Sequence, residues 1–244
     1  MPDDSLDAAD LAVLQHLVRE ALQLLDAGRP DAAARSLDEA QSLAPGHPTV
    51  LAALGELALV REQPQQARAL LQAAIEADPT LADARYALAR LLEDAGEHAA
   101  AVEHDLAVLR LDAAAHRRAG LGGRRDLQLI REVSAQTLEQ LPEHFAARLH
   151  EIPIVLEPRP SEHLVAEGFD PRAFGLFEGP DDRGRRSLDT IDPRPTRIVV
   201  FFANLLDAFP RPEDLREQVE ITLLHEIGHY FGLDEDEVDA LGLR

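Results

Sequence analysis

The chain has 244 residues, of which 45 are acidic and 24 are basic, so its formal net charge is −21. This length is enough for one large domain or two ordinary domains with real hydrophobic cores. The negative charge excludes a basic nucleic-acid platform, because a polyanion such as DNA would be repelled. The chain contains no cysteine, which excludes disulfides and thiolate metal sites and fits a reducing cytoplasm.

The first segment, residues 1–13, is interpreted as an acidic lead-in. It lacks the positive end and the apolar stretch of a secretory signal. No apolar run in the sequence reaches the length needed to span a bilayer. We therefore expect a soluble, cytoplasmic protein that binds neither membranes nor nucleic acid.

Residues 14–115 repeat with a period of 34 residues. Three units are predicted, near 14–47, 48–81 and 82–115. The positions that share the spacing are Ala33, Ala67 and Ala101, then Gly28, Glu62 and Gly96, and the pairs Pro45 and Pro79, and Ala40 and Ala74. This pattern resembles the tetratricopeptide repeat, in which small residues let two helices pack closely and a proline ends the unit. The third unit is less regular, with Asp105 where the second has Leu71.

One helical hairpin cannot bury its apolar face alone, so stacked units share a core and about three are needed for stability. The resemblance implies an all-α solenoid. Two roles are open for it. One is a concave groove that binds a protein or peptide, and the other is a scaffold that only packs against the second domain or another copy.

The second half begins after a predicted linker at residues 116–125, which contains three glycines and four arginines. Beyond it, the apolar spacing predicts a helix from Leu127 to Leu138 that ends before Pro142. Short apolar runs predict strands at Ile152–Leu156 and Arg197–Phe202, with a short edge strand within Phe174–Gly179. The segment 180–195 is predicted to be a loop. Residues 126–244 are therefore expected to form one α+β domain.

The most informative motif is His-Glu-Ile-Gly-His at residues 225–229, an HExxH. On a helix, positions i and i+4 share a face, so His225 and His229 can hold one zinc ion. Glu226 is placed to take a proton from a water that the metal activates. A proline and two acidic residues near 212–214 favour a helix start there, and Gly232 is suited to stop it. The competing interpretation is an amphipathic helix with two surface histidines.

The second half resembles the minimal zincin metallopeptidases of bacteria, whose signature is HExxHxxGxxD. The resemblance covers roughly 126–244, and the motif at its end is the specific part. It implies a compact zinc peptidase with His225 and His229 as metal ligands and Glu226 as the catalytic base. The larger metzincins are excluded, because they require a histidine at position 235 and a later methionine turn, and the only methionine is Met1.

The third ligand is where the chain departs from this signature. The aspartate of the family falls at Glu235, which is one methylene longer and is our first choice as ligand. Asp236 is the second choice, because it needs one more residue in the turn after Gly232. Asp234, Asp239 and water alone remain open.

Two functions from different classes follow from these motifs. The first is a cytoplasmic zinc-dependent peptidase whose repeats bind protein substrates or partners. The second is a repeat-based adaptor whose zincin domain binds metal but is not an efficient peptidase. Both need the two histidines, whereas only the enzyme needs Glu226. Tyr230, His163 and Arg185 are conceivable as a second electrophilic group.

Overall fold

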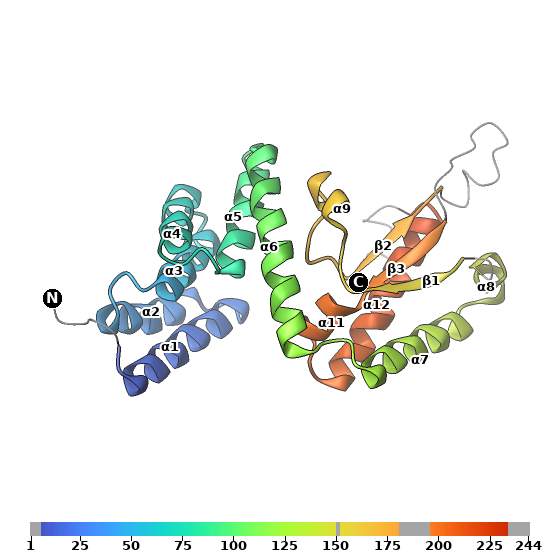
Figure 1. Ribbon diagram of the computed structural model, residues 1–244, viewed down its shortest axis with the longest axis horizontal. Coiled ribbons are helices and arrows are strands. Elements are labelled where there is room, and N and C mark those ends of the chain that lie inside the picture. Colours follow the sequence, from blue (N-terminus) through green and yellow to red (C-terminus); the bar gives the residue numbers. More distant parts are fainter. Residues whose placement is uncertain (1–5, 150–151, 181–195, 234–244) are drawn as a thin grey trace. The chain divides into compact units, whose positions relative to one another are not determined.

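The computed structural model describes residues 6–149, 152–180 and 196–233 (Figure 1). Contacts within the chain divide it into two compact units. The first unit runs to Asp112 and includes Ala166–Gly168, and the second unit contains Ala113–Val165 and the chain from Phe169 onward. None of the described helices combines the length and the apolar character needed to cross a membrane.

The first unit consists of helical hairpins that follow the predicted period. In chain order the helices are α1 (Ala8–Asp26), α2 (Pro30–Leu43), α3 (Pro48–Val60), α4 (Pro64–Ala77), α5 (Ala82–Asp94) and α6 (His98–Ala119). Helix α1 begins inside the segment that we interpreted as a lead-in. The predicted all-α repeat architecture is confirmed.

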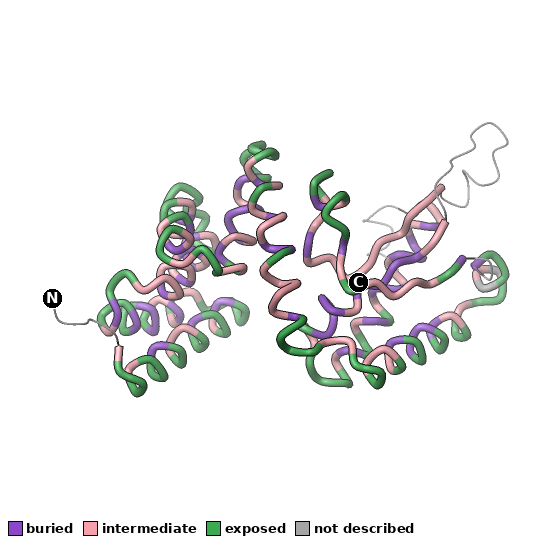
Figure 2. Tube along the Cα trace, viewed as in Figure 1, coloured by how far each residue is buried: buried purple, intermediate pink, exposed green. Residues whose placement is uncertain are grey.

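Small residues at the repeating positions bring the helices of each hairpin together. Ala33, Ala67 and Ala101 are all buried, with at most 3% of their surface exposed. Along α1 and α2 buried residues alternate with exposed ones, as expected for helices that pack on one side (Figure 2).

The turn inside each hairpin has the same backbone conformation in all three repeats. Gly28, Glu62 and Gly96 occupy it with φ angles of 66°, 55° and 76°. The N–H of each donates to the carbonyl oxygen three residues before it, and the next N–H donates to a carbonyl five residues back. Glu62 adopts a left-handed conformation that favours glycine, which places local strain in the middle repeat.

The third repeat contains a partly buried ion pair. The carboxylate of Asp105, on α6, accepts a hydrogen bond from the Arg90 guanidinium on α5, and only 3% of the Asp105 side chain is exposed. The Arg90 guanidinium also lies 5.1 Å from the centroid of the Tyr86 ring and bonds to Glu93. Asp105, which stands where the second repeat has Leu71, is therefore paired with the Arg90 cation on the neighbouring helix.

Helix α6 continues to Ala119, so residues 116–119 of the predicted linker are helical. The physical reason is the alanine-rich run that precedes them, since alanine is the strongest helix former. His116, 4% exposed, lies 3.5 Å from Asp207 through Nε2, and its Nδ1 is 3.2 Å from an Arg159 nitrogen. Residues 120–123 connect α6 to the next helix, α7 (Arg124–Gln140).

The second unit contains a small mixed sheet. Its described strands are β1 (Ile154–Glu157), β2 (Gly175–Glu178) and β3 (Arg197–Phe201), in the order β1-β3-β2. Strand β3 runs parallel to β1, with Ile154 opposite Ile198, and antiparallel to β2, with Gly175 opposite Val200. All three lie within one or two residues of the predicted strands. The loop predicted at 180–195 lies outside the described residues except for its first.

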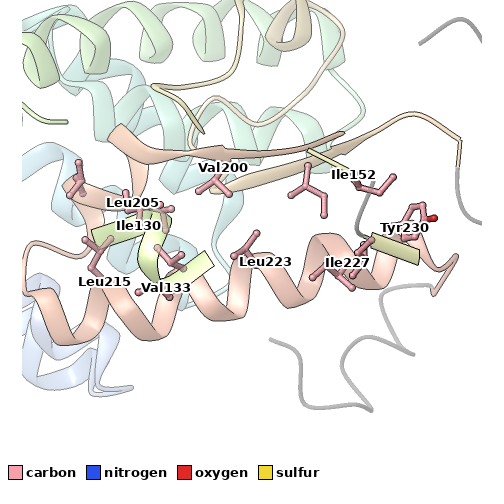
Figure 3. Close-up of a cluster of buried hydrophobic side chains, with 13 residues drawn as sticks. Ile130, Val133, Ile152, Val200, Leu205, Leu215, Leu223, Ile227 and Tyr230 are labelled. Carbon is pink, nitrogen blue, oxygen red and sulfur yellow. The ribbon is translucent and has the colours of Figure 1, made fainter. Parts of the chain in front are cut away.

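The helices that the structure describes in this part of the chain are α7, α8 (Glu143–Leu149), α9 (Glu162–Ala166), α11 (Phe202–Ala208) and α12 (Pro212–Tyr230). Helices α7 and α12 pack against each other, and α12 packs on β2 and β3. Their shared core contains Ile130 of α7, Val200 of β3 and Leu223 of α12 (Figure 3). This core fixes α12, the helix that carries the HExxH motif, against the sheet.

Candidate metal centre

Helix α12 starts as the sequence predicts. Pro212 occupies its first turn, where a missing N–H costs nothing, and Glu213 and Asp214 lie at the positive end of the helix dipole. Arg211 binds Asp214 through two hydrogen bonds of 2.6 and 2.9 Å. The helix then runs without interruption through both histidines.

The two histidines face a common point. Nε2 of His225 and Nε2 of His229 are 3.0 Å apart, and the rings are almost perpendicular, with an angle of 85° between their planes. Both side chains are half-buried. The structure thus brings together the two residues that we predicted as metal ligands.

Glu226 lies between them in sequence and is only 7% exposed. Its carboxylate sits against Gly175, the first residue of β2. A Cβ atom on Gly175 would lie 2.7 Å from Oε1 of Glu226 and 2.7 Å from Cγ2 of Thr222. The absence of a side chain at 175 therefore makes the space in which the Glu226 carboxylate lies.

The donor set fits a zinc ion. Zinc bonds imidazole nitrogen at about 2.0–2.1 Å, and tetrahedral angles then place two such nitrogens about 3.3 Å apart. The two Nε2 atoms are 3.0 Å apart, so they need to separate by only a few tenths of an ångström to reach this distance. A buried carboxylate such as Glu226 is also stabilised by a nearby cation, because burial removes the water that otherwise solvates its charge.

The third ligand remains a prediction. Glu235, Asp234, Asp236 and Asp239 all lie outside the described residues. Among the residues that the structure describes, no group of three or more histidine, aspartate or glutamate side chains could hold a metal. Of the predicted ligands, the described residues therefore contain His225 and His229.

The end of α12 is confirmed where the sequence placed it. Gly232 has a φ angle of 72°. Its N–H donates to the carbonyl of His229, and the N–H of Leu233 donates to the carbonyl of Gly228. This pair of bonds is a Schellman motif, which ends the helix and turns the chain directly after the second histidine.

A cleft of about 650 Å³ opens beside the histidines and Glu226. This volume lies within the range of about 300–1,000 Å³ that is typical of ligand sites. One wall is the face of α12 that carries Gln218, Ile221 and Thr222. The other wall is β2 and the segment before it, from Phe169 to Phe177.

Strand β2 is held at the edge of the described sheet by an ion cluster. Arg197 of β3 bonds to Glu178, its cross-strand neighbour on β2, and to Glu157 of β1 at 2.9 Å. The Glu178 carboxylate raises the pKa of the Arg197 guanidinium, so this cation is permanent. Through Arg197, the cluster links the three described strands, with its β2 contact at Glu178, the end of β2 away from Gly175.

The three residues considered as a second electrophilic group, Tyr230, His163 and Arg185, lie in different places. The hydroxyl of the buried Tyr230 donates to the Arg148 carbonyl at 3.4 Å, and its ring packs on Phe177 and Phe231. Tyr230 is thus a packing residue in this structure. His163 lies exposed on α9 and does not line the cleft, and Arg185 lies outside the described residues.

Sequence reasoning missed Gly175 and the residues before it as parts of the site. The signal was the short apolar segment between two glycines, which predicted an edge strand that can lie over the metal but not the close approach of Gly175 to Glu226. That approach depends on a contact between residues 51 positions apart, so local patterns do not contain it.

Comparisons with known protein families agree with this structure. A profile of the family described as zincin-like metallopeptidase matches residues 149–243. Two tetratricopeptide repeat profiles match residues 24–79 and 70–103. The order of these matches confirms the order predicted from the sequence. No curated protein matches the chain.

Proposed function

The chain carries tetratricopeptide repeats ahead of a zincin-like metallopeptidase region, and from this premise we propose that it is a zinc-dependent peptidase. The observation that carries the proposal is the arrangement of three side chains on α12. Two imidazole nitrogens lie 3.0 Å apart, and the Glu226 carboxylate lies beside them in a space kept open by Gly175. Zinc-dependent peptide hydrolysis uses this combination of metal ligands and base.

Each residue has a defined role in the proposal. His225 and His229 hold the zinc, together with a third ligand that we assign first to Glu235 and next to Asp236. Zinc, when bound, supplies Lewis-acid activation of a water and of the peptide carbonyl. Glu226 accepts the proton of the attacking water and delivers it to the nitrogen of the leaving amine.

The substrate is proposed to be a peptide or an unfolded protein segment. Strand β2 is one of the two edge strands of the described sheet, and it borders the cleft. An extended substrate can add to such an edge through backbone hydrogen bonds, which recognise any sequence in an extended conformation. This placement would bring a scissile bond alongside α12.

The repeats are proposed to bind a protein, either a substrate or a partner, in the cytoplasm. Tetratricopeptide units stack their hairpins and leave surfaces suited to extended binding. The net charge of −21 favours partners that carry positive charge.

The proposal is tested by comparing three variants of the full chain with the wild-type protein. Each protein is loaded with zinc and dialysed, its metal content is measured by elemental analysis, and cleavage of a pool of fluorogenic peptides is followed. Glu226→Gln is expected to keep the zinc and to lose hydrolysis by about 100-fold or more. His225→Ala is expected to lose both. Glu220→Gln, on an exposed part of the same helix, is the matched control and is expected to change neither.

The adaptor hypothesis predicts a different result. In that case the wild-type protein binds zinc through the same histidines but cleaves no peptide in the pool, and Glu226→Gln is indistinguishable from it.

A further inference from the structure

The cleft beside the metal ligands is lined by phenylalanines that are each supported from behind. Phe169 packs edge-on against Phe201, Phe174 against Phe209, and Phe177 against Tyr230, with ring centroids 5.5–6.2 Å apart. The whole chain contains only eight phenylalanines and two tyrosines, with no tryptophan. Six of these ten aromatic residues form the three pairs at the cleft. Aromatic side chains are thus concentrated at one place in a chain that has few of them.

The backbone that carries these rings is fixed by hydrogen bonds. Asn204 of α11 is 6% exposed, and its amide nitrogen donates to the carbonyls of Pro171 and Ala173 at 3.0 and 2.8 Å. The Phe201 N–H donates to the carbonyl of Phe174 at 2.8 Å. A buried amide that satisfies two carbonyls of one segment holds that segment in a single conformation. The aromatic wall is therefore preformed.

The opposite wall, on α12, contributes one apolar side chain near the histidines, among the polar residues Gln218 and Thr222. Ile221 lies one helical turn before His225 on the same face of α12 and is half-buried in the cleft. Phe174 is the residue directly before Gly175, which contacts Glu226. Ile221 and Phe174 thus line the same cleft as the proposed base and metal ligands.

We propose that this cleft is a specificity subsite that selects a bulky apolar side chain, aromatic or long aliphatic, next to the bond that is cleaved. The inference rests on the proposed peptidase function and adds the class of substrate to it. Preformed apolar walls bind an apolar side chain without a cost for ordering the protein, and they reject charged side chains because burial removes their water.

The first experiment measures binding without cleavage. Glu226→Gln is titrated with fluorescein-labelled heptapeptides that are identical except for a central Phe, Leu, Ala or Asp, and fluorescence anisotropy is recorded. The Phe and Leu peptides are expected to bind at least about 10-fold more tightly than the Ala peptide, as two or more buried methylene equivalents imply. The Asp peptide is expected to bind most weakly.

A second variant tests the location of the subsite. Ile221→Asp, made in the Glu226→Gln background, is expected to abolish the preference for Phe and to favour a peptide with central Arg. The matched control is Val13→Asp in the same background, which adds the same charge at a half-exposed position on α1. This control is expected to keep the preference for Phe, and circular dichroism checks that both variants are folded.

The outcomes separate this inference from the proposed function. Equal binding of the Phe and Ala peptides, or an unchanged preference in Ile221→Asp, overturns the subsite. Preferential binding of Phe by a protein whose zinc-loaded wild type cleaves no peptide supports the subsite and removes the peptidase function. Cleavage by the wild type with no side-chain preference supports the peptidase function and overturns the subsite.

Discussion

At the scale of single residues, the site depends on an atom that is missing from Gly175. The Glu226 carboxylate and the Thr222 methyl occupy the volume in which a Cβ at position 175 would lie. Neither group can move away freely, because both residues are on a buried face of α12. A glycine on a neighbouring strand therefore determines where the proposed base sits.

Gly175→Ala is expected to displace the Glu226 carboxylate and to lower peptide hydrolysis on the order of 10- to 100-fold, since small misplacements of reacting groups are costly. Zinc binding is expected to persist, because His225 and His229 are not among the closest atoms to the added carbon. Hydrolysis rates and zinc content of the same preparation provide the measurement. Gly123→Ala is the control, since the nearest atom to its added Cβ is an Asp126 oxygen at 3.3 Å. Unchanged hydrolysis in Gly175→Ala would show that Glu226 tolerates the displacement.

Glu56 is a second residue whose environment has a measurable consequence. Burial raises the pKa of its carboxyl, and the carboxylates of Asp83 and Asp26 raise it further. A raised pKa means that the folded state binds the proton more tightly than the unfolded state. The stability that the protonated Glu56 contributes to the folded state is fully present below the unfolded pKa. It is lost as pH rises through the folded pKa. Above its raised folded pKa, the ionised Glu56 carboxylate therefore weakens the first unit.

Glu56→Gln is expected to raise the urea midpoint of the first unit at pH values above the raised pKa of Glu56. The gain should shrink as pH falls through the raised pKa of Glu56, because the wild-type carboxyl is then also neutral. Urea denaturation of the wild type and the variant at several pH values measures the difference. Glu76→Gln, at an exposed position on α4, serves as the control and should show no such trend. A gain that is equal at all pH values would mean that the amide acts through a new contact and not through charge.

At the scale of elements, the three hairpin turns of the repeats share one backbone conformation, but the middle turn has a glutamate where the other two have a glycine. Gly28 and Gly96 adopt the left-handed conformation without strain, whereas Glu62 adopts it with a side chain. Nothing in the turn itself requires a glutamate, because its hydrogen bonds use only backbone atoms.

Glu62→Gly is thus expected to stabilise the first unit by about 1 kcal/mol, the cost of placing an ordinary residue in this conformation. Urea denaturation followed by circular dichroism provides the measurement. The matched control is Gln63→Gly, at a neighbouring position with an ordinary φ of −112°. That change is expected to destabilise the unit, because glycine gains freedom in the unfolded chain. Stabilisation by both changes would point to a general preference for flexibility between α3 and α4.

The elements that the sequence predicted best are those determined by local patterns. In α12, the start at Pro212, the spacing of His225 and His229 and the stop at Gly232 all depend on residues within one helix, and all three are confirmed. The wall of the cleft depends instead on Asn204 reaching the carbonyls of a segment about 30 residues earlier. Such long-range hydrogen bonds leave no periodic signal. The extension of α6 was missed because its arginines and nearby glycines were given more weight than the preceding alanines.

At the scale of the whole molecule, each unit has its own hydrophobic core. The described core of the second unit includes residues of α7, α12 and the sheet, whereas the clusters of the first unit involve its own helices. Because the proposed metal ligands belong to the second unit alone, zinc should stabilise the two units unequally.

Scanning calorimetry of the full chain is expected to resolve two transitions, of which zinc shifts only one. At free zinc 100 times the dissociation constant, the stabilisation is about 2.7 kcal/mol. His225→Ala should remove the shift and leave the other transition in place. A single transition that moves as a whole with zinc would show that the repeats and the metal-binding unit unfold together.

The ion pair of the third repeat has a consequence for how the solenoid assembles. Similar hairpins can dock in a wrong order, since each offers nearly the same alanine-lined surface. In the period of 34 residues, Arg90 corresponds to Glu56 and Asp105 corresponds to Leu71. If α6 docked on α3 in place of α4, Asp105 would meet Glu56, and two carboxylates would be buried against each other. The penalty for bringing like charges together in a partly buried position disfavours this arrangement relative to the observed pairing of Asp105 with Arg90.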